Sequence, residues 1–396
     1  MKAVHVITYV GRRSYGLGAV AGNLTGQQRR VGIDAAVWCL DSESEAKDAL
    51  YDYGLPNGAL VRFAINGPRW LGLSLSMERT VRAAAAGEID ILHQHGIWTL
   101  VSHVTASWTK RWRRPTVIAP HGALAPWSLL RSKWKKALAR VGYEDGNFRR
   151  AACFHATSPI EYEHFRQFGL RCPVALIPNG ISDEWLASTG EGARFRERHR
   201  LPTDRRIMLF MGRLSPIKNL VRLVEAWATV GSAADDWMLV LAGAAEFGYD
   251  KVLGTEIERF GLSGQVHWVG PVYGQDKRDG FDAAECFVLP SLSEGFGMVV
   301  LEAIAAGLPA LTTSGASWEC LRREGCGWWV KPDVGGLADA LREIFGHDTR
   351  TLQDMGDRAR ALAKRDFTWR TVCEQTGRLY DWLRHGGSMP SFVACD

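Results

Sequence analysis

Short apolar runs recur along the chain, each ending at Gly, Pro, Asn or Ser and each followed by a stretch with helical character. Runs that are apolar on both faces and alternate with helices are typical of parallel strands covered on both sides of a sheet. The pattern therefore predicts an α/β fold with parallel sheets. The predicted strands cover residues 3–9, 35–40, 89–93, 116–120, 153–157, 174–178, 206–211, 238–243, 265–269, 285–289 and 308–312.

The strand–helix pattern restarts after a polar, helix-like segment at 183–200. The length of 396 residues also exceeds the size at which one hydrophobic core stops growing, about 250–300 residues. We predict two doubly wound, Rossmann-like domains, 1–182 and 183–366, that face a central cleft with their strand ends. Residues 367–396 start with an amphipathic helix over 367–385, which we expect to cross back to the N-terminal domain.

Composition narrows the class of protein only modestly. The chain is 46% apolar and 23% charged, as in soluble globular proteins, and long disorder is not expected. A net charge of +5 and a pI near 8.8 suit anionic partners, whether nucleotides, phospholipid headgroups or nucleic acid. The eight cysteines are scattered singly, which argues against a zinc site and for a reducing cytoplasm. The sequence shows neither a signal peptide nor an apolar run that could span a membrane.

Two glutamates bracket a Gly-rich turn after the predicted strand at 285–289. Glu294 lies in the turn, and we expect a helix to begin near Phe296, with free N–H groups that suit a phosphate or a hydroxyl. Glu302 follows about one and a half turns into that helix, so at ~1.5 Å per residue the helical part alone separates the carboxylates by roughly 9 Å. Paired carboxylates of retaining glycosidases are only about 5–5.5 Å apart. The spacing favours two contacts on one long ligand, with a capping and a surface glutamate as the alternative.

Arg213 and Lys218 lie in a Pro-containing loop just after the predicted strand at 206–211. A guanidinium presents a planar fork to phosphate oxygens, and an ammonium presents a point charge. Two solvated loop cations are the alternative. The position of this loop at a strand end, in the same predicted domain as the Gly-rich turn, favours an anion site.

These two stretches resemble the group 1, or family 4, retaining glycosyltransferases of the GT-B fold. The resemblance rests on Gly212-Arg213-Leu214 through Lys218-Asn219, on Phe287 to Glu302 with its Glu-x7-Glu spacing, and on the continuation at 303–309. It is close in the second domain and looser in the first. It implies that Arg213 and Lys218 neutralise the donor diphosphate, that Glu294 contacts the sugar hydroxyls and that Glu302 binds the ribose. The amides of Gly295, Phe296, Gly297 and Met298 would face the sugar or its phosphate.

Three loops of the first domain are further candidates. Gly16 and Gly18, in the segment 15–19 (YGLGA), open the helix after the first strand, although a lone G-x-G is also common in tight turns. His93 and His95 end one strand, and His121 follows the next in a Pro-His-Gly segment. A lone histidine is more often structural, but the resemblance implies that His121 contacts the donor sugar. His93 and His95 are candidates to face the acceptor.

Basic residues and tryptophans cluster in residues 108–141. We expect an amphipathic helix over 126–141, with one apolar side and a basic remainder. Such a helix either lies on an anionic membrane or packs on its own domain with a solvated basic face. The apolar side would consist of Trp127, Leu130, Trp134, Leu138 and Val141, and the basic side of Arg131, Lys133, Lys135, Lys136 and Arg140.

Together these features predict a metal-independent hexosyltransferase with no cofactor, cytoplasmic or peripheral on the inner face of the membrane. The resemblance implies that the transfer retains the configuration of the sugar. The enzyme's donor would be a nucleotide-diphosphate sugar. Its acceptor would be a saccharide, lipid-linked in the case of cell-surface polysaccharide or exopolysaccharide biosynthesis, and no nucleic-acid partner is expected. His121, Glu294, Arg213 and Lys218 are the catalytic candidates. The alternatives are a nucleotide-sugar epimerase or hydrolase of the same fold, and a basic nucleic-acid-binding protein without enzymatic activity.

Overall fold

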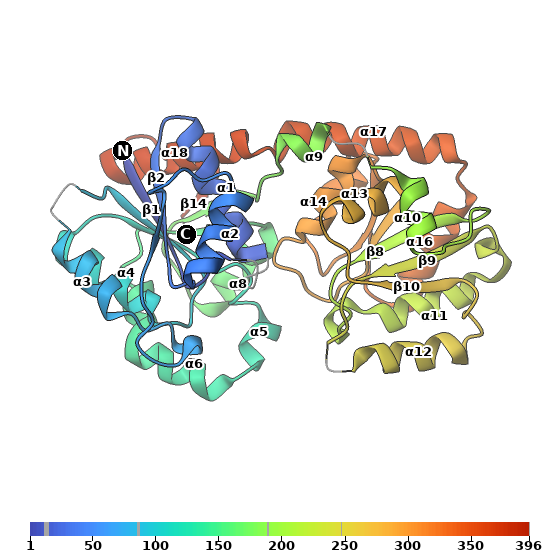
Figure 1. The fold of residues 1–396 in the computed structure, drawn as a ribbon, viewed down its shortest axis with the longest axis horizontal. Coiled ribbons are helices and arrows are strands. Elements are labelled where there is room, and N and C mark those ends of the chain that lie inside the picture. The colour runs from blue at the N-terminus through green and yellow to red at the C-terminus, as the bar shows by residue number, and fades with distance from the viewer. Residues whose placement is uncertain (12–15, 85–87, 188–189, 247, 396) are drawn as a thin grey trace. The chain divides into compact units, whose positions relative to one another are not determined.

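The computed structural model describes residues 1–11, 16–84, 88–187, 190–246 and 248–395. These residues form two units, Met1–Gly180 with Trp369–Asp396, and Ile181–Thr368. Each unit is a sheet with helices on both faces (Figure 1). The division lies close to the one expected at 182/183, and the C-terminal helix is part of the first unit.

The first unit contains an eight-stranded sheet in the order β14-β7-β6-β5-β4-β1-β2-β3. Its strands are parallel except for β14, which pairs antiparallel with β7. The strands are β1 Lys2–Ile7, β2 Asp34–Cys39, β3 Leu60–Arg62, β4 Ile91–His95, β5 Thr116–Ala119, β6 Cys153–Ala156, β7 Val174–Leu176 and β14 Val393–Ala394.

The second unit contains a six-stranded, fully parallel sheet in the order β10-β9-β8-β11-β12-β13. Its two middle strands, β8 and β11, are neighbours although they lie far apart in the sequence. The strands are β8 Arg206–Met211, β9 Trp237–Ala242, β10 Val266–Gly270, β11 Cys286–Leu289, β12 Ala310–Thr313 and β13 Gly327–Val330.

Helices follow most strands, as expected for doubly wound sheets. In the first unit they are α1 Gly16–Arg30, α2 Glu43–Asp52, α3 Leu75–Ala83, α4 Val101–Trp112, α5 Pro126–Leu130, α6 Lys133–Ala139, α7 Asp145–Phe148, α8 Pro159–Phe168 and α18 Trp369–His385. In the second they are α9 Asp183–Ala187, α10 Gly192–Arg198, α11 Leu220–Val230, α12 Tyr249–Arg259, α13 Gly274–Ala283, α14 Met298–Ala306, α15 Cys320–Arg323, α16 Val334–Gly346 and α17 Thr349–Asp366.

Each apolar run identified in the sequence overlaps a strand, and the α/β prediction is confirmed. The strands that the pattern missed are β3, β13 and β14. β3 and β14 contain only three and two residues, so neither forms a recognisable apolar run. The amphipathic helix expected at 367–385 is α18.

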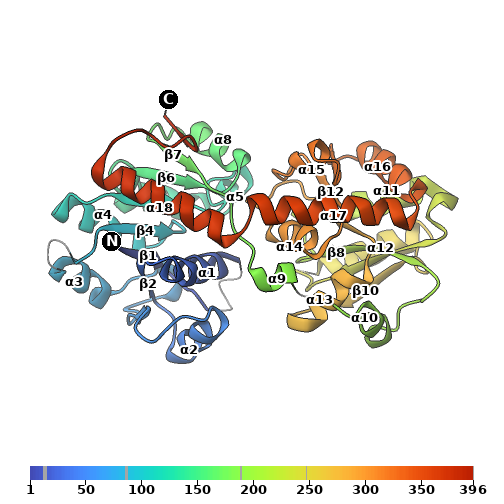
Figure 2. The same cartoon turned by 90° about the horizontal axis from the view of Figure 1, so that it is seen from above.

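The first sheet separates two apolar layers, and this separation positions the side chains discussed below. Ala3 and Ile91 face α1 and α18, whereas their neighbours Val4 and Leu92 face α3 and α4. Figure 2 shows α18 lying beside α1 on one side of this sheet. Residues of α18 are therefore part of the core beneath the strands of the first unit.

The prediction of a single helix over 126–141 is wrong. Ser132 has a left-handed backbone (φ +50°), which ends the helical path between α5 and α6, and a π-helical turn follows at Arg140–Glu144. The five residues predicted for the apolar side are each about half exposed or more, whereas Ala139 of the same segment is buried and Leu129 packs against the core of the first unit. The five exposed fractions are 48% for Trp127, 58% for Leu130, 65% for Trp134, 66% for Leu138 and 90% for Val141.

No helix among the described residues combines the length and the apolar character needed to cross a bilayer.

Candidate active site

In the second unit, the loops that follow β8 and β11 are bonded to each other. The Leu292 amide donates to the carbonyl of Ile217 at 2.8 Å. The buried Asn219 side chain donates to the carbonyl of Pro290 at 3.1 Å. The loop with Arg213 and Lys218 and the Gly-rich turn before α14 are therefore one continuous surface at the carboxyl ends of neighbouring strands.

Lys218 and Glu294 form an ion pair within this surface, and their side chains are only 13% and 14% exposed. The Ser291 hydroxyl donates to the same carboxylate at 2.7 Å. Two of the residues predicted from separate motifs are thus in direct contact. A low exposure strengthens such a pair, because less water screens the two charges.

Arg213 and Glu302 each have a different ionic partner. Arg213 is paired with Glu246, in the loop after β9, and its side chain is 51% exposed. Glu302, on α14, accepts from the ammonium of Lys277 on α13 at 2.6 and 2.7 Å. The two glutamates of the Glu-x7-Glu motif therefore pair with two different lysines. Their separate ligand roles stay predictions.

Sequence reasoning missed Lys277 and Glu246. Glu246 follows β9 by four residues, so its place near a strand end was a usable signal. Lys277 lies within a helix, at a position that no motif marks. The contact with Glu302 depends on how α13 and α14 pack.

Glycines allow the backbone of these loops to approach closely. A Cβ at Gly243 would lie 1.8 Å from the carbonyl oxygen of Gly212, and one at Gly315 would lie 2.3 Å from that of Ser291. Gly297 has φ +81°, a conformation that favours glycine. α14 begins at Met298, slightly later than expected.

Within the Gly-rich turn, the Phe296 side chain is buried against Trp318, whose indole N–H donates to the Phe296 carbonyl at 2.8 Å. The Phe296 side chain is therefore part of the core, and its backbone amide stays a predicted ligand contact. The backbone amides of Gly295, Gly297 and Met298 stay predicted ligand contacts.

In the first unit, the loop after β1 is held by Asp41. This buried carboxylate accepts from the amides of Val10 and Gly11 at 2.7 and 3.0 Å. Gly16 is exposed at the start of α1, whereas Gly18 is buried in its first turn. Tyr15, which completes the quoted segment, lies outside the described residues.

His121 lies in a tight loop after β5 that a buried carboxylate fixes. His121 and Gly122 both have left-handed backbones, with φ +52° and +78°. The Gly122 amide donates to Glu161 at 2.6 Å, and Glu161 also accepts from the amide and the hydroxyl of Thr157 at 2.8 Å each. Burial raises the pKa of Glu161. No motif in the sequence pointed to Glu161 as an anchor of this loop.

The other strand-end histidines point into the unit. His95 is 2% exposed, and its two ring nitrogens lie 2.9 Å from His5 and 3.0 Å from His121. His93 is fully buried between Tyr380 and His155, at 2.7 and 3.2 Å. The ring nitrogens of His93 and His95 are therefore used within the unit, and the position differs from the acceptor-facing one that we expected.

His5, His93 and His95 come close enough together to resemble a metal-binding group, since one nitrogen of each lies within 4.8 Å of the others. The sequence did not reveal this cluster. Every ring nitrogen of the three is already within hydrogen-bonding distance of a neighbouring group. The absence of a metal and of a cofactor stays a prediction.

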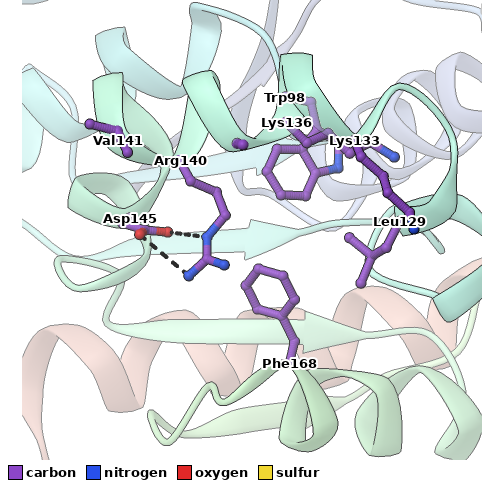
Figure 3. Close-up of a pocket in the computed structure, with 9 residues that line it drawn as sticks. Trp98, Leu129, Lys133, Lys136, Arg140, Val141, Asp145 and Phe168 are labelled. Atoms are coloured by element: carbon purple, nitrogen blue, oxygen red, sulfur yellow. Dashed lines mark hydrogen bonds and ion pairs between the residues drawn. The ribbon is translucent and has the colours of Figure 1, made fainter.

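A pocket of about 510 Å³ lies beside α6 in the first unit (Figure 3). Trp98 and Phe168 form aromatic walls, and Lys133, Lys136 and Arg140 carry positive charge. Asp145 pairs with Arg140 at 3.0 Å, which leaves an excess of positive charge among the lining residues. The remaining lining residues are Leu129, Ala137 and Val141.

Comparison with known proteins identifies both units. Residues 192–362 match the family model described as "Glycosyl transferases group 1", and residues 15–180 match that described as "Glycosyl transferase 4-like domain".

Two curated relatives resemble the chain over most of its length. The chain is 29% identical to the D-inositol 3-phosphate glycosyltransferase of Streptomyces scabiei, over 76% of this chain and 69% of the relative. It is 26% identical to the phosphatidyl-myo-inositol mannosyltransferase of Mycobacterium leprae, over 78% of each.

Among solved structures, Anabaena HepE in complex with UDP and glucose superposes with a TM-score of 0.75 at 22% identity, covering 96% of this chain and 99% of that chain. This likeness extends over both sheets and establishes a common fold. With two parallel α/β units and matches to both family models, the protein belongs to the group 1, family 4 glycosyltransferases of the GT-B fold.

Proposed function

We propose that this glycosyltransferase moves a hexosyl group from a nucleotide-diphosphate sugar to a saccharide acceptor, with retention of configuration and without a metal. The observation that carries the proposal is the Lys218–Glu294 pair, which joins a diphosphate-binding cation to a carboxylate for sugar hydroxyls on one surface with Arg213. The Anabaena protein with a related fold binds UDP and glucose, which supports this class of donor.

In this proposal the diphosphate draws Lys218 and Arg213 away from their carboxylates. Lys218 then faces a phosphate oxygen, and Glu294 accepts from hydroxyls of the sugar. The amides at the start of α14 add further positive potential at the same place. This arrangement stabilises the charge that grows on the departing diphosphate, which is the role that a metal ion has in other glycosyltransferases.

The proposed transfer breaks the bond between the sugar C1 and the diphosphate oxygen and forms a bond from C1 to the acceptor oxygen on the same face. The departing diphosphate oxygen takes the proton of the acceptor hydroxyl. With the donor bound, Glu294 accepts from sugar hydroxyls and from the Ser291 hydroxyl, so it is a poor nucleophile. Isolation of a glycosyl–enzyme adduct on Glu294 would contradict this scheme.

The acceptor side of the proposal rests on the first unit. Its pocket combines aromatic walls with three cations, which suits a saccharide that carries a phosphate. The names of the two curated relatives denote a phosphorylated and a lipid-linked inositol acceptor, which supports an acceptor of this chemistry. We propose a lipid-linked acceptor of cell-surface polysaccharide synthesis at the inner face of the membrane.

The exposed apolar residues of the 126–141 segment provide the membrane contact in this proposal. Trp134, Leu138 and Val141 are each at least 65% exposed, and the segment 126–141 contains five Lys and Arg residues. Exposed apolar groups interleaved with cations are suited to an anionic lipid surface. We expect sedimentation with vesicles that contain anionic lipid, and little with neutral vesicles.

A charge-reversal series tests this membrane contact. Lys133→Glu/Lys135→Glu/Lys136→Glu should abolish sedimentation with anionic vesicles. The matched control carries the same change in net charge at exposed positions of the second unit: Lys251→Glu/Arg322→Glu/Arg342→Glu. Equal sedimentation of the two triple variants would overturn the assignment of this surface.

Donor class and reaction are tested together. A thermal-shift panel of UDP, GDP, ADP and their sugars should show one stabilising pair, since a ligand at about 100 times its dissociation constant adds about 2.7 kcal/mol. Product analysis with and without a lipid-linked acceptor then separates transfer from hydrolysis or epimerisation. Binding to RNA or DNA with a steep salt dependence, together with an Arg213→Ala variant that keeps every activity, would favour the nucleic-acid alternative.

A further inference from the structure

The first unit contains a chain of buried polar side chains that has no place in the proposed transfer scheme. His121 is linked to His95 at 3.0 Å, His95 to His5 at 2.9 Å, and His5 to Gln28 at 2.7 Å. Except for His121, these side chains are at most 2% exposed.

This series of hydrogen bonds continues from Gln28, on α1, to the hydroxyl of Tyr380, on α18, at 3.4 Å. Tyr380 is linked to His93 at 2.7 Å, His93 to His155 at 3.2 Å, and His155 to the carbonyl of Ile177 at 2.8 Å. We call this set of seven side chains the histidine relay: His121, His95, His5, Gln28, Tyr380, His93 and His155.

The Ile177 carbonyl gives the relay a direction. A carbonyl only accepts, so the Nε2 of His155 must carry a hydrogen, and in a neutral ring its Nδ1 must then accept. His93 therefore donates from Nε2 and accepts at Nδ1, and the Tyr380 hydroxyl is the donor to it. The role of one nitrogen determines the role of the other in each ring, because a neutral imidazole has one donor and one acceptor.

Tyr380 extends this direction to the other half of the relay. Its proton is given to His93, so its oxygen can only accept, and Gln28 must present its NH₂ group to it. The Gln28 carbonyl oxygen then faces Nε2 of His5, which donates. The opposite orientation of the amide would place two oxygens together without a hydrogen between them.

The rings of His5, His95 and His121 are oriented in the same way, with each donating from Nε2. His5 accepts at Nδ1 from Nε2 of His95, and His95 accepts at Nδ1 from Nε2 of His121. Nδ1 of His121 is left as an acceptor. Burial favours the neutral rings that this order requires, since it lowers the pKa of His5 and His155 to about 4 and that of His121 to about 3.

We propose that Tyr380 and Gln28 are positioning residues that fix, through the histidine relay, the tautomer of His121 with a bare Nδ1. A bare ring nitrogen accepts from a hydroxyl and repels a phosphate oxygen. On the proposed function, His121 thus selects a sugar hydroxyl of the donor and takes no part in neutralising the diphosphate. A reversed relay would present an N–H at the same place and favour phosphate.

The tautomers are measured directly, without any ligand. Long-range ¹H–¹⁵N correlation spectra of ¹⁵N-histidine-labelled protein at neutral pH separate protonated from bare ring nitrogens, and single histidine variants assign the signals. We expect Nε2–H for His121. An Nδ1–H or a doubly protonated ring would overturn the proposal.

Tyr380→Phe removes the hydroxyl that sets the orientation of Gln28, and it should shift His121 toward Nδ1–H. Thr376→Val is the matched control, because it removes another buried hydroxyl of α18 that donates only to the Val372 carbonyl; it should leave the His121 tautomer unchanged. An unchanged tautomer in Tyr380→Phe would overturn the role of Tyr380. If Tyr380→Phe does not fold, Gln28→Met tests the same link from α1.

Ligand binding gives a second, separate readout. The nucleotide sugar and the sugar-free diphosphate that stabilise the wild-type protein most in the thermal-shift panel serve as probes. Tyr380→Phe should weaken binding of the nucleotide sugar about three- to tenfold, as expected for the loss of one neutral hydrogen bond. Binding of the diphosphate should be unchanged. Failure of every nucleotide to bind would overturn the proposed function, whereas the tautomer spectra decide the relay independently.

Discussion

Lys218, in the loop after β8, and Glu294, in the loop after β11, form an ion pair between side chains that are 13% and 14% exposed. The pair links the cation predicted for the donor diphosphate to the carboxylate predicted for the sugar. A diphosphate that binds Lys218 must compete with Glu294. The same exchange releases the carboxylate for hydroxyl groups, so the two halves of the donor are recognised by one rearrangement.

Replacement of Lys218 by Met should lower kcat/KM for the nucleotide sugar by about 100-fold or more. This is the usual effect of removing one group that stabilises transition-state charge. Steady-state kinetics measures the change. Lys251→Met is the control, because this exposed lysine of α12 has the same charge and belongs to the same unit. A Lys218→Met enzyme with near-normal kcat/KM would contradict the assigned role.

Glu294→Gln and Glu302→Gln should differ in which ligand they affect. Glu302 is assigned to the ribose, so its replacement should weaken the binding of both the nucleoside diphosphate and the nucleotide sugar by about three- to tenfold. Glu294 is assigned to the sugar, so its replacement should weaken only the nucleotide sugar. Calorimetric titration of both ligands into both variants tests the division. Identical ligand profiles for the two variants would count against it.

Glu246→Gln should tighten diphosphate binding. Glu246 is the partner of Arg213, whose side chain is 51% exposed, and the amide removes a competing negative charge. Surface pairs contribute at most about 1 kcal/mol, so the gain should not exceed about fivefold, and it should shrink in high salt. Titration at two ionic strengths measures it, with Asp339→Asn, which removes the partner of Arg342, as the control. Weaker diphosphate binding by Glu246→Gln would indicate that Glu246 positions Arg213 for the ligand.

As the pH is lowered, the first unit should unfold before the second. Burial lowers the pKa of His5, His93, His95, His121 and His155, so the unfolded state binds more protons than the folded state below pH 6.5. The resulting stability is present above pH 6.5 and is lost as pH falls toward 4, by up to about 1.4 kcal/mol per histidine and pH unit.

Two buried carboxyls of the first unit act in the opposite direction. Burial raises the pKa of Glu144 to about 7 and also raises that of Glu161, so their contribution is present below their unfolded pKa and fades as pH rises. They offset part of the histidine effect. Hydrogen exchange from pH 7 to 4 should show β1, β4, β5 and β6 losing protection first, with β8, β9 and β11 as the internal reference. Loss of protection by both units at one pH would refute the prediction.

Much of the second-unit site could be predicted from the sequence, because its residues belong to loops that directly follow strands. Parallel strands bring their carboxyl ends to one edge of a sheet, so Lys218 and Glu294 were expected to share a surface. Their direct contact depends on β8 and β11 being neighbours, and strand order is not encoded locally. The pairing of Lys277 with Glu302 could likewise not be predicted from the sequence, because only the packing of α13 against α14 creates that contact.

The segment 126–141 shows the limit of periodicity. Its apolar residues have helical spacing, yet Ser132 adopts a left-handed backbone and divides the segment into short helices. Hydrophobic spacing reports which side chains share a face, but it does not report a single residue whose backbone leaves the helical path.

The sequence by itself determined the α/β class, the positions of most strands, the loops that carry Arg213, Lys218, Glu294 and Glu302, and membership of the family. These features are local, because they depend on the order of apolar runs and on short spacings. The tertiary structure alone decided which charges pair and how the histidines are connected. Tyr380 reaches His93 across 287 positions of the chain, and such a contact arises only when α18 packs against the first sheet.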